Sequence, residues 1–203
     1  MAWINNGDKT RGSSGSGLGL SSSDDFLPSE FNVYLYHGLA TSGSNNSPEI
    51  RYDGVSADDY SWRKSGNGGN DGAVTADNNI QIDNHGGSTD KFGVVYSANI
   101  AGEEKLQTSF LVDSGGAGAG NVPNRTVGVG KMDTTTNTAQ YTAIEFDSMS
   151  YTLNQHSNLS ALGDRGTKTS DLANIQTNSI FETSDTGKHY IWNSSTSTWT
   201  EVA

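Results

Sequence analysis

The 203-residue chain contains no cysteine, only 3 prolines and only 12 lysines and arginines. Without cysteine there can be no disulfide, no thiolate metal site and no cysteine nucleophile. The basic residues stand against 23 acidic ones, so the formal net charge is −11. A nucleic-acid partner needs a basic footprint, so this balance predicts no nucleic-acid binding. No run of 18 apolar residues is present, and we therefore expect no membrane insertion.

Hydrophobic residues make up only 32% of the chain, and 25 glycines stand among many serines, threonines and asparagines. All four residue types are weak helix formers, so the composition argues against helices. It suits many short strands joined by long turns, which predicts an all-β protein. A chain of this length can bury roughly 70% of its unfolded surface, enough for one large domain with appendages.

Residues 1–28 are expected to form a flexible Gly/Ser-rich N-terminal arm, because residues 11–23 are almost all glycine and serine. Trp3 and Ile4 form an apolar tip before this tract. One interpretation is a disordered tail. The other is an anchoring arm that docks Trp3 and Ile4 onto a neighbouring subunit, since such segments can order on assembly. The first eight residues carry no basic and apolar signal-peptide pattern, so we expect synthesis in a cytoplasm.

Residues 29–163 carry about eight short segments that alternate apolar and polar residues, at the spacing of a β-sandwich. A jelly roll is the preferred topology and an immunoglobulin-like sandwich is the alternative. The middle of the chain is expected to supply the core. There, two long predicted strands each hold an apolar set on one parity: Phe92, Val94 and Tyr96 in residues 91–100, then Leu106, Phe110 and Val112 in residues 106–112.

Residues 164–203 are expected to form a linker and a small aromatic β-meander, with a tight turn at residues 184–187. Tyr190, Trp192 and Trp199 lie in this meander. They can cement the meander onto a sandwich or onto a neighbouring subunit, or they can stack on sugar rings. A segment this short has little core of its own, which favours packing over glycan binding and suggests symmetric assembly.

Catalytic and metal-binding patterns are weak, so we expect no catalytic residues, no cofactor and no metal site. The four histidines, His37, His85, His156 and His189, are too far apart in the sequence to suggest a zinc site. Acidic residues are plentiful, but the sequence places no two of them as the pair that glycoside hydrolysis needs. Calcium in the loops at Asp71-Gly72 and Asp77-Asn78-Asn79 is an alternative that is not favoured, because the spacing is not that of an EF-hand.

Several segments resemble structural proteins of tailed bacteriophages and marine environmental viruses. The C-terminal run from Thr186-Gly187-Lys188 through Tyr190 and Trp192 to Trp199 is similar to terminal hairpins of such virion proteins. The second set of similar segments is Asn99–Leu106, Gly116–Gly120, Val122–Arg125, Val129–Lys131 and Leu162–Asp164. The resemblance covers about residues 90–203 and implies a β-sandwich of the capsid-decoration, head-fibre or tail-fibre type, with no catalytic residues to carry over.

We therefore expect a non-enzymatic structural virion protein, surface-exposed on the particle and attached through its N-terminal arm. Its expected partners are further copies of itself, as a homotrimer, and other virion proteins such as the capsid. A glycan-binding host-attachment module of a phage fibre, with cell-surface glycans as its ligands, is the main alternative. A secreted polysaccharide-degrading enzyme is a third interpretation.

Overall fold

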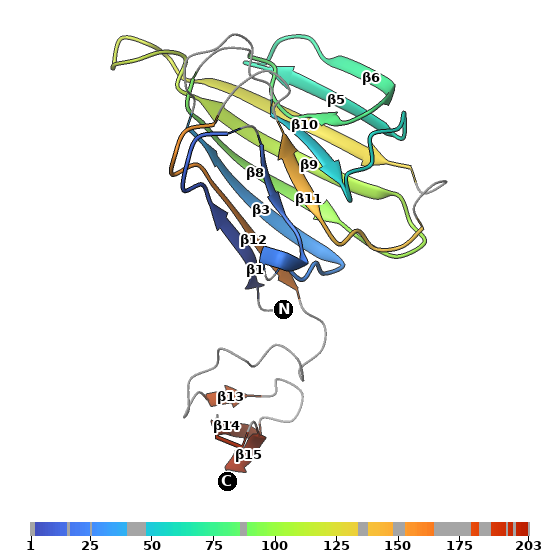
Figure 1. Cartoon of the computed structure of the whole chain (residues 1–203), viewed down its shortest axis with the longest axis vertical. Helices are drawn as coiled ribbons and strands as arrows, with labels where there is room; N and C mark the ends of the chain where they lie inside the picture. Colours follow the sequence, from blue (N-terminus) through green and yellow to red (C-terminus); the bar gives the residue numbers. More distant parts are fainter. Residues whose placement is uncertain are drawn as a thin grey trace. The chain divides into compact units, whose positions relative to one another are not determined.

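The computed structural model describes residues 3–15, 17–24, 26–39, 48–85, 89–133, 138–147, 153–164, 180–182, 188–193, 195–196 and 198–202. The chain divides into two compact units, Met1–Asp164 and Arg165–Ala203. The described part contains fifteen strands and one short 3-10 helix, η1 (Ser22–Asp24) (Figure 1). No helix in this part is long and apolar enough to cross a membrane. The expected all-β class is confirmed.

The first unit consists of two antiparallel sheets. The large sheet has eight strands in the order β1 (Trp3–Thr10), β12 (Asn158–Asp164), β3 (Phe31–Gly38), β8 (Lys91–Ala98), β9 (Lys105–Asp113), β10 (Asn124–Met132), β5 (Tyr60–Gly66), β6 (Gly72–Asp77). The small sheet has four strands in the order β2 (Leu18–Leu20), β11 (Ile144–Asp147), β4 (Glu49–Tyr52), β7 (Ile80–Gln81).

Eight of these strands are connected as a jelly roll. In chain order they are β1, β2, β3, β4, β7, β8, β11 and β12. The first pairs with the last, the second with the seventh, the third with the sixth and the fourth with the fifth. A long hairpin rolled up on itself gives this nesting, so the topology matches the expected jelly roll rather than the immunoglobulin-like alternative.

Two hairpins are added to the roll and both extend the large sheet. Strands β5 and β6 come between β4 and β7 of the roll, and β9 and β10 come between β8 and β11. The hairpins join each other through β10 and β5, in register from Thr126 opposite Gly66 to Met132 opposite Tyr60. The large sheet therefore runs four strands beyond the part that the roll supplies (Figure 1).

Tyrosines fill much of the space between the two sheets, because a tyrosine ring packs in a core while its hydroxyl still needs a partner. Tyr52 stacks on Tyr141 with ring centroids 4.3 Å apart. The hydroxyls of Tyr34 and Tyr141 lie 2.7 Å apart, and Tyr141 donates to Ser97 Oγ at 3.2 Å. Tyr52 donates to Gln107 Oε1 at 2.5 Å. This network ties the small sheet to β3, β8 and β9 of the large one.

The N-terminal segment differs from the expected flexible arm. Residues 3–10 form β1, which pairs with β12 along the edge of the large sheet. Gly15 exchanges two backbone hydrogen bonds with Leu153, at 2.8 and 3.0 Å. Leu18, Leu20 and Phe26 are buried in the core. Backbone pairing with distant strands and loops therefore holds the Gly/Ser tract in place, and the sandwich begins before residue 29.

The second unit is a three-stranded antiparallel meander in the order β13 (Ile180–Glu182), β14 (His189–Asn193), β15 (Thr198–Val202). The expected C-terminal aromatic meander is confirmed. The tight turn expected at residues 184–187 lies outside the described residues.

Candidate functional site

An apolar surface covers the middle of the large sheet, on the side that faces away from the small sheet. We call it the apolar face. It consists of eight large side chains from β3, β8, β9 and β10, each 41–53% exposed: Phe31, Phe92, Tyr96, Leu106, Phe110, Val112, Val127 and Val129. Side chains alternate between the two faces of a strand, so these residues share one face of four adjacent strands.

The strand register arranges these side chains in rows across the sheet. From β3 to β10 the three complete rows are His37–Phe92–Val112–Arg125, Leu35–Val94–Phe110–Val127 and Val33–Tyr96–Thr108–Val129. Phe31, Tyr96 and Leu106 also line a shallow apolar hollow at one end of the face. Arg125 ends the first row, and beside the rows on β10 and β5 lie Lys131 and Arg63, which pair with Glu104 and Asp71. An apolar centre with a polar rim is the usual anatomy of a protein–protein interface.

This face corrects the sequence-based expectation for the core. Phe92, Tyr96, Leu106, Phe110 and Val112 were expected inside but are about half-exposed, and Val94 shares their outward side. The opposite parity of the same strands is buried and mostly polar: Lys91, Ser97, Lys105, Gln107, Ser109, Asp113 and Thr126. The strands were predicted at the right places, but the inward side was assigned to the wrong parity.

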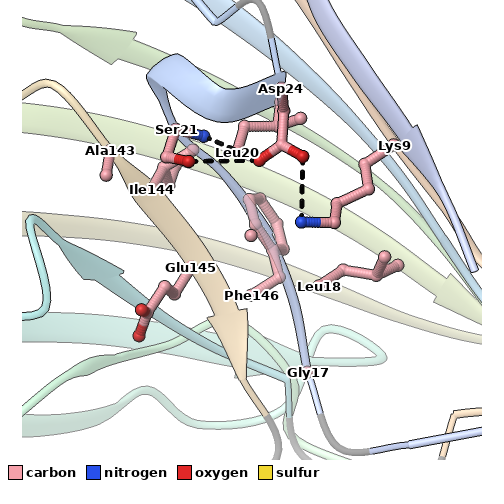
Figure 2. A pocket seen from close by; sticks show the side chains of 11 residues that line it. Lys9, Gly17, Leu18, Leu20, Ser21, Asp24, Ala143, Ile144, Glu145 and Phe146 are labelled. Carbon is pink, nitrogen blue, oxygen red and sulfur yellow. Dashed lines mark hydrogen bonds and ion pairs between the residues drawn. The ribbon is translucent and has the colours of Figure 1, made fainter.

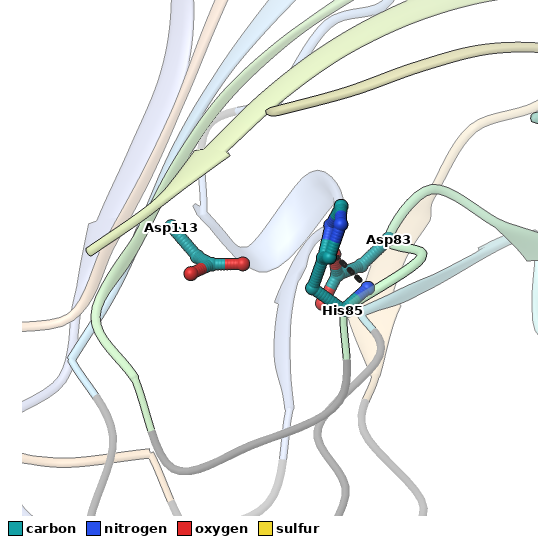
Figure 3. Close-up of side chains that lie close together, drawn as sticks. All are labelled: Asp83, His85 and Asp113. Atoms are coloured by element: carbon teal, nitrogen blue, oxygen red, sulfur yellow. Dashed lines mark hydrogen bonds and ion pairs between the residues drawn. The ribbon is translucent and has the colours of Figure 1, made fainter. Parts of the chain in front are cut away.

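A buried ionic cluster lies on that inner side, where the segment after β7 meets the ends of β8 and β9. Lys91 Nζ donates to Asp83 Oδ2 at 2.6 Å and lies 3.8 Å from Asp113 Oδ2. Asp83 Oδ1 accepts the backbone N–H of His85 at 2.9 Å. Figure 3 shows how Asp83, His85 and Asp113 face one another. The side chains of Asp83, Lys91 and Asp113 are essentially inaccessible to solvent.

The charges of the cluster are satisfied within the protein, as in a structural salt bridge. Asp83, His85 and Asp113 bring potential ligand atoms within 4.8 Å of one another. The Lys91 ammonium, however, already supplies the positive charge that a metal ion would bring. Asp113 Oδ1 also accepts from Gly115 N at 2.7 Å and from Asn124 Nδ2 at 3.0 Å. Both carboxylates therefore have protein donors, which is the condition for keeping a charge buried.

The loops named as calcium alternatives use their carboxylates on neighbouring side chains. Asp77 Oδ2 accepts the indole N–H of Trp62 at 2.8 Å, and Asp71 pairs with Arg63 at 3.2 Å. Asp53, at the end of β4, accepts the backbone N–H groups of Thr142 and Ala143 at 2.7 and 2.8 Å. These carboxylates hold turns and strand ends in place.

A second pocket lies beside β2 and β11, where Lys9 and Asp24 line it together with residues 17–21 and 143–146 (Figure 2). Lys9 Nζ lies 3.0 Å from Asp24 Oδ1, and Ser21 N and Oγ donate to Asp24 Oδ2 at 3.1 and 3.2 Å. Burial opposes ionisation of Asp24, but Lys9 and Ser21 outweigh it and lower the pKa of this carboxyl. Asp24 is thus held as the ionised partner of Lys9.

The aromatic residues singled out in the C-terminal meander meet in a cross-strand pair. Trp192 and Trp199 lie directly opposite each other, with ring centroids 5.3 Å apart. Trp192 is only 5% exposed, whereas Tyr190 and Trp199 are half-buried. Burial of Trp192 favours the packing interpretation. A glycan contact through Tyr190 and Trp199 stays a prediction.

The anchor residues predicted at the N-terminus lie in a strand. Trp3 and Ile4 are the first residues of β1 and pair with Asp164 and Gly163 of β12. Their side chains lie outside the described part of the structure, so a docking role for them stays a prediction. The residues that sequence reasoning missed are Phe31, Val127 and Val129 on the apolar face and the Asp83–Lys91–Asp113 cluster. Only the Asp-x-His spacing of Asp83 and His85 hinted at this cluster.

Compared with family models, with curated proteins and with solved structures, the chain shows no match.

Proposed function

We propose that the chain is a non-enzymatic structural protein of a virus particle, an exposed decoration or fibre-like subunit that works as a homo-oligomer. The observation that carries this proposal is the apolar face. A rigid jelly roll with a broad apolar surface on one sheet is suited to burial against a neighbouring subunit. The resemblance of residues 90–203 to virion proteins supports the viral setting, and the net charge of −11 suits an outer surface that avoids unspecific association.

The polar sites of the described residues support a structural role over an enzymatic one. The Asp83–Lys91–Asp113 cluster is buried and internally paired. Asp24 is neutralised by Lys9. Glycan binding through the C-terminal aromatics is the second candidate, and the burial of Trp192 weighs against it because a sugar ring needs an accessible aromatic face.

The test is whether the protein belongs to a particle. Particles are purified on a density gradient from cells that carry the gene, and their proteins are quantified by mass spectrometry. We expect this chain in a fixed ratio to the major shell protein, and we expect antibodies raised against it to label the outside of intact particles, with pre-immune serum as the control. Its absence from particles, or turnover of a polysaccharide by the purified protein, would contradict the proposal.

A further inference from the structure

The apolar face is larger than a monomeric protein usually leaves open. A fully exposed aromatic side chain offers about 150–250 Å² and valine or leucine somewhat less, so eight half-exposed side chains present on the order of 700 Å². The largest patch of a typical monomer is about 300–600 Å². The rows of the face carry two hydroxyls, on Tyr96 and on Thr108, of which Thr108 donates its own to Gly128 O at 3.3 Å, and their other side chains are mostly hydrocarbon. The chemistry of the face therefore fits an equally apolar protein surface.

We propose that the apolar face packs against the apolar face of a second copy of this chain, sheet on sheet, around a two-fold axis. This inference rests on the proposed function as an assembly subunit and names the contact that builds it. Two such faces together bury on the order of 1,400 Å², within the about 1,200–2,000 Å² of specific interfaces. The same patch serves both copies, as a two-fold contact requires.

The position of the face within the sheet favours a pair over a trimer. The four strands of the apolar face are the third to sixth of eight, flanked by β1 and β12 on one side and by β5 and β6 on the other. Around a three-fold axis each apolar face would have to contact two other copies at once. The strands that flank the face would then collide with the flanking strands of those copies before the faces met. Two eight-stranded sheets can instead lie face to face at about 10 Å, as the sheets of a sandwich do.

The charged rim bears on the direction of the axis. Arg63, Arg125 and Lys131 all lie on the β5 and β10 side of the face, where Asp71 pairs with Arg63 and Glu104 pairs with Lys131. An axis across the strands would lay this charged, hydrated side over itself. An axis parallel to the strands lays it over β3 and β12 of the second copy, where Leu162 and Ser160 lie opposite Val33 and Leu35.

This arrangement also matches side-chain sizes. With the axis midway between β8 and β9, each side chain of β8 lies over its own β9 row partner in the second copy. The row partners are Phe92 with Val112, Val94 with Phe110 and Tyr96 with Thr108. Each pair combines a large ring with a smaller side chain, so the two faces can interdigitate.

The experiment measures the mass of the full chain in solution by sedimentation equilibrium. We expect a reversible dimer of the 21.5 kDa chain. Phe110→Asp puts a charge at the centre of the face without removing a buried side chain, and it should raise the dimer dissociation constant at least about tenfold. Val122→Asp is the matched control, because Val122 is 82% exposed in the β9–β10 loop and is not one of the side chains of the apolar face. This variant should dimerise like the unaltered chain.

The unaltered chain decides the outcome even where a variant fails to fold. A monomer or a trimer over the accessible concentration range would overturn the inference, as would a dimer that Phe110→Asp and Phe92→Ser both leave intact. Such a result leaves the proposed function standing if the chain is found in purified particles. A two-fold dimer that is absent from particles would contradict the proposed function and support the contact.

Discussion

At the scale of single residues, the interior of the large sheet depends on charges that neutralise one another. The side chains of Asp83 and Lys91 are fully buried, and Lys91 Nζ lies 2.6 Å from Asp83 Oδ2. Removing one member of such a pair leaves the other charge buried without compensation, which costs far more than losing a surface pair. Arg63 and Asp71 form a surface pair of this second kind, with about half of each side chain exposed.

We therefore expect Asp83→Asn to lower the free energy of unfolding by about 3–5 kcal/mol. Asp71→Asn should lower it by less than about 1 kcal/mol. Urea denaturation of both variants measures the two losses. Adding Lys91→Met to Asp83→Asn should deepen the loss, because Lys91 Nζ also lies 3.8 Å from Asp113 Oδ2 and its removal leaves that buried carboxylate without a cation. Equal losses for Asp83→Asn and Asp71→Asn would show that the cluster is not a buried ion pair.

The buried tyrosines make stability depend on alkaline pH. Burial raises the pKa of Tyr141 to about 12, although its hydrogen bonds with Ser97, Tyr34 and Asn32 reduce the rise. Burial also raises the pKa values of Tyr34 and Tyr52 well above the ordinary 10. The unfolded chain loses these protons first. The stabilisation is therefore complete below pH 10 and is lost as pH rises through the folded-state values.

The unfolding free energy should thus fall between pH 10 and 12, by up to about 1.4 kcal/mol per pH unit for each tyrosine. Tyr141→Phe should remove the contribution of one tyrosine from this pH dependence, so the unfolding free energy should fall less steeply. At neutral pH the same variant should be about 1 kcal/mol less stable, because its hydrogen bonds are lost. Urea midpoints over this pH range give both values. An unaltered slope in the Tyr141→Phe protein would mean that this hydroxyl ionises equally in both states.

At the scale of elements, the N-terminal strand completes the edge of the sandwich. Strand β1 pairs with β12 from Trp3 opposite Asp164 to Thr10 opposite Asn158. Asn6 Nδ2 also donates to Ser29 Oγ at 2.9 Å inside the protein. Without β1, the backbone of β12 would become an open edge, which invites aggregation.

A variant lacking residues 1–10 should therefore aggregate or unfold at a much lower urea concentration, as followed by light scattering and circular dichroism. Lys9→Gln is the control, because it breaks only the Lys9–Asp24 pair and should cost less than about 1 kcal/mol. If the shortened protein were as stable as the full chain, the segment would be a detachable arm as the sequence suggested.

The strands could be predicted from the sequence, but their inward sides could not. The period of two in residues 91–98 and 105–113 marks both strands correctly. The same period leaves two faces as candidates for the buried side. Hydrophobicity alone predicts that the face with Phe92, Tyr96 and Phe110 is buried, whereas this face is the exposed one. Lys91 and Gln107 point inward because partners from distant segments meet them there: Asp113 Oδ2 lies 3.8 Å from Lys91 Nζ, and the Tyr52 hydroxyl donates to Gln107 Oε1 at 2.5 Å. No local pattern contains those partners.

The glycine- and serine-rich N-terminal segment was misjudged for a related reason. Composition measures how freely a segment moves when it is isolated, and residues 11–17 are flexible by that measure. The contacts that hold the segment come from far along the chain, as in the bridge between Gly15 and Leu153. Long-range strand pairing therefore overrides local flexibility here, whereas the aromatic C-terminal meander is local and was predicted correctly.

At the scale of the whole molecule, net charge opposes the proposed pairing. Each copy carries a formal charge of −11, so two copies repel each other at low ionic strength. Added salt shortens the screening length from about 10 Å at 0.1 M to about 3 Å at 1 M. An interface held by apolar contacts should therefore tighten as salt is added.

We expect the dimer dissociation constant to fall several-fold over that range of sodium chloride, and further in sodium sulfate. Sedimentation at each salt concentration measures it, with Phe110→Asp as the non-associating reference. Weaker association at high salt would indicate an interface held by ion pairs rather than by the apolar face.

The two added hairpins offer a use that lies outside the assembly itself. The roll is closed by its own eight strands, so the β9–β10 tip at residues 114–123 is a free end of the architecture rather than a link in it. Residues 117–122 at this tip are exposed. Foreign peptides grafted there would be carried outward without rerouting the chain, which makes the tip a natural insertion point for epitope display.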